Sequence, residues 1–414
     1  MTNKKPELLA PAGDLTKLKF AIMYGADAVY IGGEAFGLRT ASRNFGMSDM
    51  AEGVRFAHER GRKVYLTTNI IPHNEDINAF AEYLDNAVKT GIDAVIAADL
   101  GLFALIHKRY PDLPIHISTQ ANNVNYMSAN VWHELGASRV VLARELSFGE
   151  VAEVRKNTPP ELELESFVHG AMCVSYSGRC LLSNYLTGRD ANQGACAQPC
   201  RWKYALVEEK RPGQYMPVME DDDGSFIFNS KDMCMIEYIP QLVETGVNTF
   251  KIEGRVKSEY YVATVVKAYR EAIDRYFGDP TGYTFDPAAL EELQKVSHRP
   301  YCTGFYCGKT DTNSQVYANS SYIRDYDIVG QVVGYDAETG IATVAQRNKL
   351  YIGDTIEIIQ PGKPYFTQTV EWIKNSGGES IESTPHAEML YTMPVAQPVS
   401  EYAMIRTGAL VSGE

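Results

Sequence analysis

Apolar and polar residues follow one repeated pattern through residues 1–280. A short run rich in β-branched residues is followed by a polar turn, and then by apolar residues three and four positions apart, as on one face of a helix. Several of the helical segments end in glycine, which commonly terminates a helix. The short runs predict eight strands, at residues 7–10, 28–32, 63–68, 94–97, 115–118, 139–142, 162–168 and 248–252.

Eight strands that alternate with helices are the number that closes a (β/α)8 barrel of the TIM type, a fold of the α/β class. An open, doubly wound sheet is less favoured, because it usually has fewer strands and the chain contains no G-x-G-x-x-G turn. The connection after the seventh strand is much longer than the others and forms an insertion at about residues 169–230. Loops that follow the strands of such a barrel form its catalytic face, so the pattern predicts this insertion at the barrel mouth.

The pattern changes after residue 280. Residues 281–325 are expected to form a linker and a connecting segment with one short helix. From residue 326 to 414, short alternating runs are separated by turn residues, which predicts a small antiparallel β-barrel. The chain is therefore expected to contain a barrel domain at 1–280 and a second, smaller domain at 326–414.

Composition limits the class of protein. The 414 residues are 45% hydrophobic and 22% charged, as in a globular chain, and no apolar run approaches the ~20 residues of a membrane span. We therefore expect a soluble cytoplasmic protein without a membrane partner. In a reducing cytosol, the seven cysteines are more often metal ligands than disulfide partners, and their odd number also argues against a disulfide framework.

The net charge of −13 argues against a general nucleic-acid-binding surface, because binding to phosphates requires clustered lysine and arginine. Between His169 and Lys203, however, four basic residues stand against one acidic residue, Asp190. This stretch is a local basic region in an acidic chain. Any contact with RNA is expected there.

Four of the seven cysteines lie in this same stretch, with the spacing C-x6-C-x15-C-x3-C. Structural zinc sites usually contain a C-x2-C pair, and none is present here. Four thiolates with wider spacing favour an iron-sulfur cluster, whereas a zinc site or no metal remain the alternatives. The candidate metal ligands are Cys173, Cys180, Cys196 and Cys200.

The chain resembles the peptidase U32 family, also called collagenase-like, over essentially its whole length. The resemblance is carried by ELLAPAGDLTKLKFAIMYGADAVYIGG, FGLRTASRNF, HISTQANNVN, HGAMCVSYSGRCLLSNYLTGRDANQGACAQPCRW and FKIEGRVKSEYYVATVV. Within the family, it is most similar to members that hydroxylate the wobble uridine of tRNA to 5-hydroxyuridine, with prephenate in place of oxygen. Other members hydroxylate ribosomal RNA or the ubiquinone ring.

The resemblance implies an iron-sulfur RNA-modifying enzyme. Its cofactor would be an iron-sulfur cluster, [4Fe-4S] in the first instance, held by the four cysteines. Its partners would be tRNA and the small molecule prephenate, and a paralogous subunit of the same family is a further candidate. The alternatives are a peptidase or collagenase-like hydrolase, and a zinc-stabilised binding protein without catalysis.

The peptidase alternative has little support in the motifs of the chain. There is no H-E-x-x-H and no G-x-S-x-G, and His133-Glu134 lacks the second histidine of a zinc protease. If all four cysteines bind one cluster, no open position remains there for a hydrolytic water. A triad assembled from distant residues remains open.

Polar residues at the ends of several predicted strands are candidates for substrate binding. Arg39 and Arg43 follow the second strand, and Arg144 follows the sixth. Guanidinium groups bind carboxylates through paired hydrogen bonds, and prephenate carries two carboxylates, although ion pairs at the barrel rim are an equal alternative. Asn69 and Gln120 end the third and fifth strands and could bind carbonyl or hydroxyl groups.

Candidate catalytic residues end the last two strands of the predicted barrel. Lys251, Glu253 and Arg255 lie in FKIEGR, where the alternation of a strand directs several of them to one side. His169 ends the seventh strand and could orient a substrate or donate a proton. A histidine bonded to the backbone beside the cluster is the alternative.

Aromatic and basic residues alternate within the insertion. Stacking on aromatic rings and contact with phosphates are what binding of a single-stranded RNA loop requires, whereas shielding of the cluster from water is the other interpretation. The candidate RNA-binding residues are Arg179, Tyr185, Arg189, Arg201 and Trp202.

Overall fold

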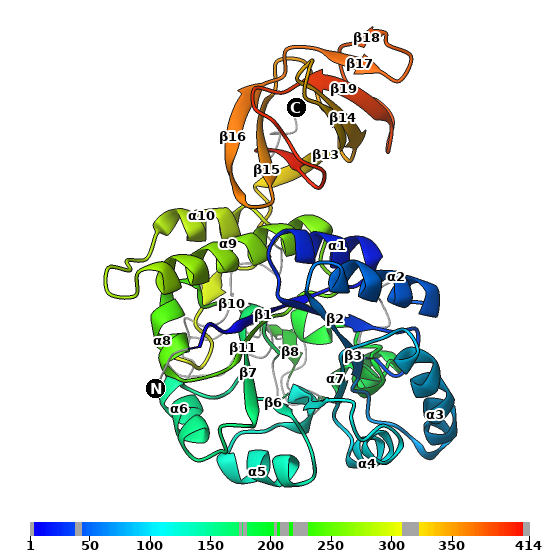
Figure 1. Cartoon of the computed structure of the whole chain (residues 1–414), viewed down its shortest axis with the longest axis vertical. Helices are drawn as coiled ribbons and strands as arrows, with labels where there is room; N and C mark the ends of the chain where they lie inside the picture. The colour runs from blue at the N-terminus through cyan, green and yellow to red at the C-terminus, as the bar shows by residue number, and fades with distance from the viewer. Residues whose placement is uncertain are drawn as a thin grey trace.

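The computed structural model describes residues 4–37, 44–173, 176, 180–202, 205–207, 215–217, 231–308 and 323–408. Within these ranges, eight parallel strands form a closed barrel, each paired with its neighbours along the chain. The last strand pairs with both the first and the seventh, which closes the barrel. The strands are β1 (Glu7–Pro11), β2 (Ala28–Gly32), β3 (Lys63–Thr68), β4 (Ala94–Ala97), β5 (Ile115–Ile117), β6 (Arg139–Val141), β7 (Glu163–Ala171) and β11 (Thr249–Ile252). The predicted TIM-type barrel is confirmed (Figure 1).

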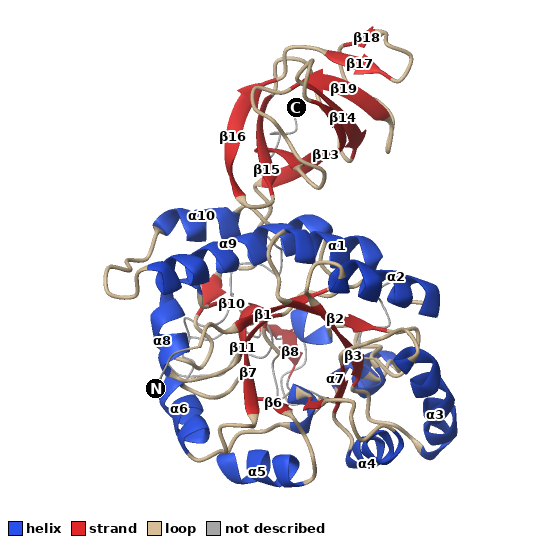
Figure 2. Ribbon diagram, viewed as in Figure 1, coloured by secondary structure: helices blue, strands red, loops and turns tan. Residues whose placement is uncertain are grey.

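Helices surround the barrel, as Figure 2 shows, and their ends follow local sequence signals. The side chain of Asp14 accepts a hydrogen bond from the amide of Lys17, which is the N-cap expected of an aspartate before a helix. Ser147 and Glu150 form a reciprocal capping box. The helices are α1 (Leu15–Met23), α2 (Met47–His58), α3 (Asn74–Val88), α4 (Leu100–Arg109), α5 (Tyr126–Glu134), α6 (Phe148–Lys156), α8 (Ile239–Glu244) and α9 (Glu259–Gly278).

The main hydrophobic core lies between the barrel wall and these helices. Strand residues that face outward, such as Leu8 and Phe250, pack against helical residues such as Leu18 and Val265. A separate small cluster fills part of the barrel interior and includes Tyr30 and Tyr65. The alternation of side chains along a strand explains this division into two faces.

Two short strands extend the sheet beyond the barrel. β10 (Asp232–Cys234) pairs antiparallel with the end of β7, and β12 (Tyr301–Cys302) pairs parallel with β10. The apolar spacing of residues 232–246 is typical of a helix, but residues 232–234 form a strand and the helix α8 begins only at Ile239. The segment between the two domains contains α10 (Pro287–Gln294) and then returns to the barrel sheet at β12.

The C-terminal region is an antiparallel sheet that curls around its own core, with β16 and β18 at its edges. Valine and isoleucine on the alternating buried positions of its strands supply much of that core. The strands are β13 (Tyr326–Asp336), β14 (Ile341–Gln346), β15 (Thr355–Gln360), β16 (Lys363–Thr369), β17 (Ile373–Asn375), β18 (Ser380–Ile381), β19 (Leu390–Pro394) and β20 (Met404–Gly408).

A buried arginine joins this sheet to the barrel domain. Arg406 of β20 is fully buried and its Nη2 lies 2.8 Å from Glu292 of α10 and 2.6 Å from Glu357 of β15. Its Nη1 donates to the hydroxyl of Tyr260 on α9 (3.3 Å). The hydroxyl of Tyr24 adds a bond to the carbonyl of Tyr402 (2.9 Å). These contacts attach the C-terminal sheet to α9 and α10, on the outer side of the barrel.

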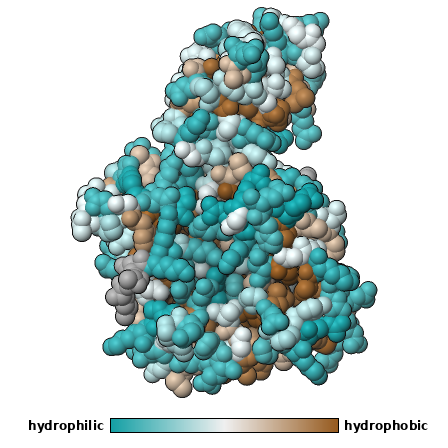
Figure 3. Space-filling model, viewed as in Figure 1, coloured by the Kyte–Doolittle hydropathy of each residue, from teal (hydrophilic) through white to brown (hydrophobic). Residues whose placement is uncertain are grey.

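The described helices include none that is both long enough and apolar enough to cross a membrane. Figure 3 shows hydrophilic residues over most of the visible face, with separate apolar areas on both parts of the chain.

Candidate active site

A pocket lies where the barrel strands end. Its lining includes six of the residues predicted from the sequence, contributed by the ends of four strands or the loops after them. These residues are Asn69, Gln120, Arg144, Lys251, Glu253 and Arg255. We call it the mouth pocket. Its position is that of the active sites of TIM-barrel enzymes.

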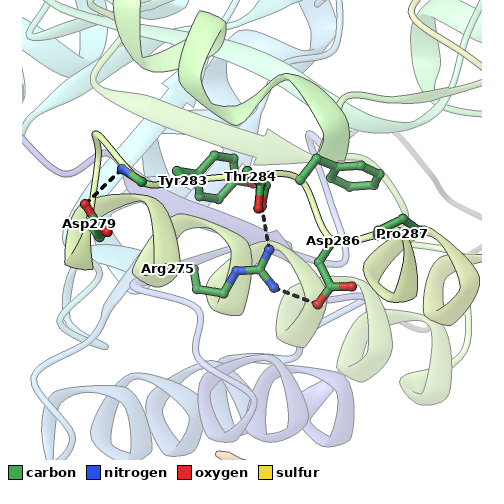
Figure 4. A pocket seen from close by; sticks show the side chains of 8 residues that line it. Arg275, Asp279, Tyr283, Thr284, Asp286 and Pro287 are labelled. Atoms are coloured by element: carbon green, nitrogen blue, oxygen red, sulfur yellow. Dashed lines mark hydrogen bonds and ion pairs between the residues drawn. The ribbon is translucent and has the colours of Figure 1, made fainter.

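A second hollow, of about 370 Å³, lies beside the C-terminal end of α9 (Figure 4). Its polar groups are bonded to one another: Arg275 pairs with Asp286 (2.7 Å) and donates to the carbonyl of Thr284 (3.0 Å), and Asp279 accepts from the amide of Gly282. These bonds fix the loop that leads to α10. The hollow lacks the convergent, buried charges of the mouth pocket, which we therefore take as the candidate site.

Arg144 is 9% exposed and forms one wall of the mouth pocket. Its Nη1 donates to the carbonyl of Ala171 (2.6 Å), its guanidinium carbon lies 4.0 Å from the centroid of the Phe167 ring, and its Nη2 is 3.8 Å from Glu253 Oε2. Among the described residues, Nε has no hydrogen-bond partner. The guanidinium is held at the rim with part of its donor capacity unused.

Lys251 enters the pocket from β11. Its Nζ lies 2.6 Å from Glu165 Oε1 and 4.5 Å from the centroid of the Tyr30 ring. Glu165 is fully buried, so this pair lies inside the barrel and out of contact with solvent. An ammonium group in such a place is held in one position by its carboxylate partner and the aromatic face.

Arg255 follows β11 and is 3% exposed. Its Nη1 donates to Thr67 Oγ1 (2.7 Å) and its Nη2 to Asn44 Oδ1 (3.4 Å). A Cβ on Gly32 would lie 2.5 Å from this guanidinium, so any larger residue there would displace the guanidinium from its present position. The side chain thus crosses the end of β2 to reach β3.

Uncharged groups complete the pocket on the side of β3 and β5. Asn69 Nδ2 donates to Ser118 Oγ (3.0 Å), and the same oxygen accepts from the amide of Gln120 (3.2 Å). Gln120 belongs to η1 (Thr119–Ala121), a single turn that follows β5. The two amide side chains are placed as the sequence predicted, at the ends of the third and fifth barrel strands.

Glu253 contributes the one carboxylate among the described lining residues. Its amide donates to the carbonyl of His169 (2.8 Å), and the hydroxyl of Tyr30 is 3.5 Å from its Oε2. Gly170 lies against it with φ of +109°, and a Cβ there would be 2.6 Å from the Glu253 carbonyl oxygen. Glycine at position 170 is therefore needed for the backbone to pass.

The described lining includes three cations, Arg144, Lys251 and Arg255, and one carboxylate. Cationic side chains in a dry pocket favour an anionic ligand, and arginine in particular suits carboxylates or phosphates. Arg39 and Arg43, the other two predicted carboxylate ligands, lie outside the described residues.

His169 is not brought to the mouth pocket. It is 1% exposed, and its ring contacts the rings of Tyr261, Tyr269 and Tyr301 at centroid distances of 6.0, 5.5 and 5.4 Å. Burial, together with the charge of Lys257, lowers the pKa of His169 to about 3, so the ring is neutral near pH 7. The structure places it among the tyrosines outside the barrel wall rather than against the pocket.

An irregularity in strand pairing accounts for this position. Phe167 pairs with Lys251, but the next residue of β11, Ile252, pairs with His169, so that Val168 is an extra residue on β7. A one-residue shift of this kind moves the following side chains to the opposite face of the sheet. Phe167 therefore lines the pocket, whereas His169 points away.

The four cysteines lie in and beside the insertion, above β7. Three of them border a compact unit in which α7 packs against η3 and the Ala197 amide donates to Ser183 Oγ (2.9 Å). Cys173 follows β7, Cys180 precedes α7 (Leu182–Thr187), Cys196 follows η2 (Ala191–Gln193), and Cys200 lies in η3 (Pro199–Arg201). None of the chain's seven cysteines, all described, is in a disulfide.

The insertion rests on the loop after β3. The amide of Ile71 donates to the carbonyl of Asn192 (3.2 Å), and Gln193 Nε2 contacts the Ile71 carbonyl. Residues 190–194 thus touch the side of the barrel on which Asn69 lines the mouth pocket. A short hairpin, β8 (Ala205–Val207) with β9 (Tyr215–Pro217), follows the cysteines.

The donor chemistry of the four cysteines fits an iron-sulfur cluster, because four thiols outside disulfides are the usual ligands of [2Fe-2S] and [4Fe-4S] centres. All four are at least partly exposed. In the part of the chain that the structure describes, no three Cys, His, Asp or Glu side chains converge closely enough to hold a single metal ion.

Of the predicted RNA-binding residues, Tyr185 and Trp202 are 85% and 47% exposed, and Arg189 is also exposed. Tyr185 lies on α7 and Trp202 directly after η3, two elements that pack together. Arg179 and the side chain of Arg201 lie outside the described residues.

The residues that support the pocket from inside the barrel were not predicted from the sequence. Glu165 and Arg139 are buried inside the barrel, and Thr67 and Ser118 line the mouth. A signal was present, because Glu163 and Glu165 occupy alternate positions of a strand that was expected to be buried. Charged residues at such positions indicate paired partners within the barrel.

Comparison with known proteins supports a single family for the whole chain. A model described as "Peptidase family U32" matches residues 13–316, and one described as "Peptidase family U32 C-terminal domain" matches residues 324–406. The chain is 40% identical over 405 residues to "tRNA hydroxylation protein P1" of Bacillus subtilis, covering 98% of this chain and 95% of that protein.

Two further relatives show the range of names within the family. "tRNA hydroxylation protein P" of Escherichia coli is 38% identical over 443 residues and covers 97% of this chain and 96% of its own length. "Collagenase" of Porphyromonas gingivalis is 33% identical over 383 residues and covers 89% of this chain and 90% of its own. On the match of both family models and of these relatives over nearly the whole length, the chain belongs to peptidase family U32.

Proposed function

We propose that this chain is a cytoplasmic RNA-modifying enzyme that hydroxylates the wobble uridine of tRNA to 5-hydroxyuridine, with prephenate as co-substrate in place of oxygen. The observation that carries the proposal is the similarity to the Bacillus subtilis tRNA hydroxylation protein, which extends over 98% of the chain. The cationic mouth pocket beneath a cysteine-containing insertion supports it, because it offers a place for an anionic co-substrate next to a place for a cofactor.

Prephenate would bind in the mouth pocket through its two carboxylates. Arg144 and Lys251 are two described cations of this pocket with donors beyond those they use, and Arg39 and Arg43 remain candidates for the second carboxylate. Asn69 would contact a hydroxyl or carbonyl oxygen of the same molecule. Uncharged amide donors of this kind orient a ligand that charged groups attract.

Glu253 is the candidate for proton transfer in this pocket. Its Oε2 lies near the Tyr30 hydroxyl (3.5 Å) and near Arg144 Nη2 (3.8 Å), so its carboxylate is held on the pocket side of β11. A carboxylate fixed in this way can accept a proton from a bound hydroxyl group. Arg255 would act in support, because it ties the end of β11 to Thr67 of β3.

Cys173, Cys180, Cys196 and Cys200 would hold an iron-sulfur cluster, [4Fe-4S] in the first instance. Such a cluster supplies electron transfer or structural support for the insertion. The protein's own contribution is to place these thiols above β7, where the insertion rests on the loop after β3.

The anticodon loop would lie against the outer face of the insertion. Tyr185 and Trp202 expose rings on which unpaired bases can stack, and Arg189 lies two residues beyond the end of α7, where it can reach a phosphate. Because the chain as a whole is acidic, contact with RNA would be confined to this face and to any paralogous subunit that assists it.

A peptidase activity, suggested by the name of the Porphyromonas gingivalis relative, is the less favoured alternative. The described lining of the mouth pocket contains Ser118 and two threonines but neither histidine nor cysteine. A serine or threonine nucleophile requires a neighbouring base. The one carboxylate among the described lining residues, Glu253, follows β11 and lies near Arg144, whereas Ser118 follows β5. Cleavage of defined peptides by purified protein would reverse this preference.

The proposal is tested by nucleoside analysis of tRNA from a strain that lacks the gene. Loss of 5-hydroxyuridine, restored by the wild-type gene but not by Cys173→Ala, is expected. Cys307→Ala is the matched control, because this exposed cysteine lies outside the insertion and should restore the nucleoside fully. Unchanged 5-hydroxyuridine in the deletion strain would refute the proposed function. Purified wild-type protein should contain iron and sulfide, and Cys173→Ala should contain less of both.

A further inference from the structure

A column of alternating charges runs along the inside of the barrel and ends at the mouth pocket. It consists of Glu7, Arg139, Glu165 and Lys251, which come from β1, β6, β7 and β11. We call it the axial column. The interior of most TIM barrels is filled by branched apolar residues, so four charged side chains in this position require an explanation.

The contacts in the axial column are short, and the two made by Glu165 are buried, whereas the Glu7 side chain at the far end is 17% exposed. Arg139 Nη1 lies 2.8 Å from Glu7 Oε1 and 3.2 Å from Glu165 Oε2, and the other oxygen of Glu165 accepts from Lys251 Nζ at 2.6 Å. The side chains of Arg139, Glu165 and Lys251 are 4%, 0% and 6% exposed. Glu165 is therefore held on both oxygens by cations that cannot move into solvent.

The two cations of the column, Arg139 at the lower end and Lys251 at the upper end, differ in how many acceptors they contact among the described residues. Arg139 also pairs with Glu163 (2.6 Å), so its guanidinium contacts three carboxylates. Lys251 has three N–H donors, and Glu165 is its one hydrogen-bond acceptor among the described residues. A buried ammonium group with unused donors is costly unless a further acceptor is present.

The unused donors of Lys251 border the same part of the pocket as Arg144. Both cations lie over the ring of Phe167, at 5.4 Å for Lys251 Nζ and 4.0 Å for the guanidinium carbon of Arg144. Arg144 Nε also lacks a hydrogen-bond partner among the described residues. Two incompletely bonded cations beside one aromatic ring form a site that suits a carboxylate group.

We propose that Lys251, together with Arg144, binds one carboxylate of an anionic substrate, and that Glu165 and Arg139 are positioning residues that hold the Lys251 ammonium toward the mouth pocket. Glu165 prevents Lys251 from turning away, and Arg139 in turn fixes Glu165. The identity of the anion as prephenate rests on the proposed function, whereas the role of the axial column does not.

The test measures binding of prephenate and of malonate to the full-length protein by calorimetry, without RNA. Lys251→Met and Glu165→Gln should each weaken binding by about 10- to 100-fold, the range for loss of one charged hydrogen bond. Because Glu165 acts through Lys251, the double variant should bind no more weakly than Lys251→Met alone. Arg139→Lys, which retains the charge, should weaken binding less than Glu165→Gln.

A matched control separates positioning from general destabilisation. Glu357→Gln removes a carboxylate from the buried pair with Arg406 at the C-terminal sheet, far along the chain from the pocket. It should lower stability and leave the affinity for either anion unchanged. If Glu165→Gln behaves like Glu357→Gln, with lower stability and unchanged affinity, the column is structural and the inference is wrong.

Further outcomes distinguish this inference from the proposed function. Additive effects of Glu165→Gln and Lys251→Met, or no binding of either anion to the wild type, would also overturn the inference. Normal anion binding that depends on Lys251 and Glu165, combined with unchanged 5-hydroxyuridine in the deletion strain, would uphold the site and refute the tRNA reaction. Loss of 5-hydroxyuridine in the deletion strain, combined with unchanged anion affinity in Glu165→Gln, would uphold the tRNA reaction and refute the role of the axial column.

Discussion

The axial column and the cluster around Arg406 are both networks of buried charge, but they differ in how completely their cations are bonded. Arg406 uses all three of its side-chain nitrogens, in bonds to Glu357, Tyr260 and Glu292. Among the described residues, Lys251 donates one hydrogen bond, to Glu165. The first network joins two parts of the chain, whereas the second ends at a pocket.

This difference separates a structural role from a functional one. A buried cation whose donors are satisfied by the protein has no capacity left for a ligand, and removing one partner leaves the others uncompensated. A buried cation with unused donors is costly to the free protein, and a ligand that supplies the missing acceptors recovers that cost. Exposure alone would not distinguish Arg406 from Lys251, because both are nearly inaccessible to solvent.

The largest effect is expected at Arg406. Arg406→Met should lower the free energy of unfolding by about 3 kcal/mol, because the partly buried carboxylates of Glu292 and Glu357 would keep only Lys295 as a cationic partner among the described residues. Urea denaturation measures the loss, and activity per folded molecule should be unchanged. Arg324→Met is the matched control: its pair with Asp327 is exposed, so the change should stay within about 0.5 kcal/mol. Equal losses in both variants would contradict the comparison.

Much of the barrel could be predicted from sequence, because its signals are local. Every barrel strand overlaps its predicted run, since short apolar runs, most of them with β-branched residues and a neighbouring glycine or proline, mark the strands independently of their partners. The strand β10 was missed for the opposite reason. Asp232, Met233 and Cys234 have no strand pattern of their own and become a strand only because the end of β7 offers an unpaired edge.

The candidate site was predictable in its location but not in its connections. Six lining residues were found because a barrel brings the ends of its strands together. His169 was a candidate because it ends the seventh strand, but the extra residue Val168 turns its side chain away from the pocket. The partners of Lys251 were not predicted, because Glu165 and Arg139 meet only when β7 and β6 close around the axis, a contact that no local pattern encodes.

A loss of stability of intermediate size should appear on acidification, and it concerns His116, which lies near two charges of the axial column. His116 of β5 is buried inside the barrel, with its ring 4.7 Å from that of Tyr65. Burial, and then the nearby charges of Arg139, Lys251 and Lys63, hold the pKa of His116 well below its ordinary value near 6.5. Below that pH the unfolded chain binds a proton that the folded chain excludes, so stability should fall as the pH decreases.

The contribution of His116 is isolated by substitution. Between pH 6.5 and 5, His116→Gln should lose about 1 kcal/mol less stability per pH unit than the wild type, as measured by urea denaturation at each pH. A remaining slope is expected from His169, whose pKa is lowered to about 3. His386→Gln, at an exposed position of the C-terminal sheet, should leave the slope unchanged. A slope in His116→Gln equal to that of the wild type would show that protonation of His116 is not a source of the acid sensitivity.

The smallest effect is expected where the interface between barrel and C-terminal sheet reaches solvent. Arg347 Nε lies 3.7 Å from Glu259 Oε1 of α9, with side chains 32% and 27% exposed. This pair joins the same two parts of the chain as Arg406 does, yet water already solvates both of its charges. Arg347→Met should therefore cost less than about 1 kcal/mol in urea denaturation, and the cost should shrink further at high salt, which screens exposed charges. A loss as large as that of Arg406→Met, unaffected by salt, would mean that the number of pairs across the interface decides its strength. The expected small, salt-sensitive loss would mean that the burial of the pairs, and not their number, decides the strength of the interface.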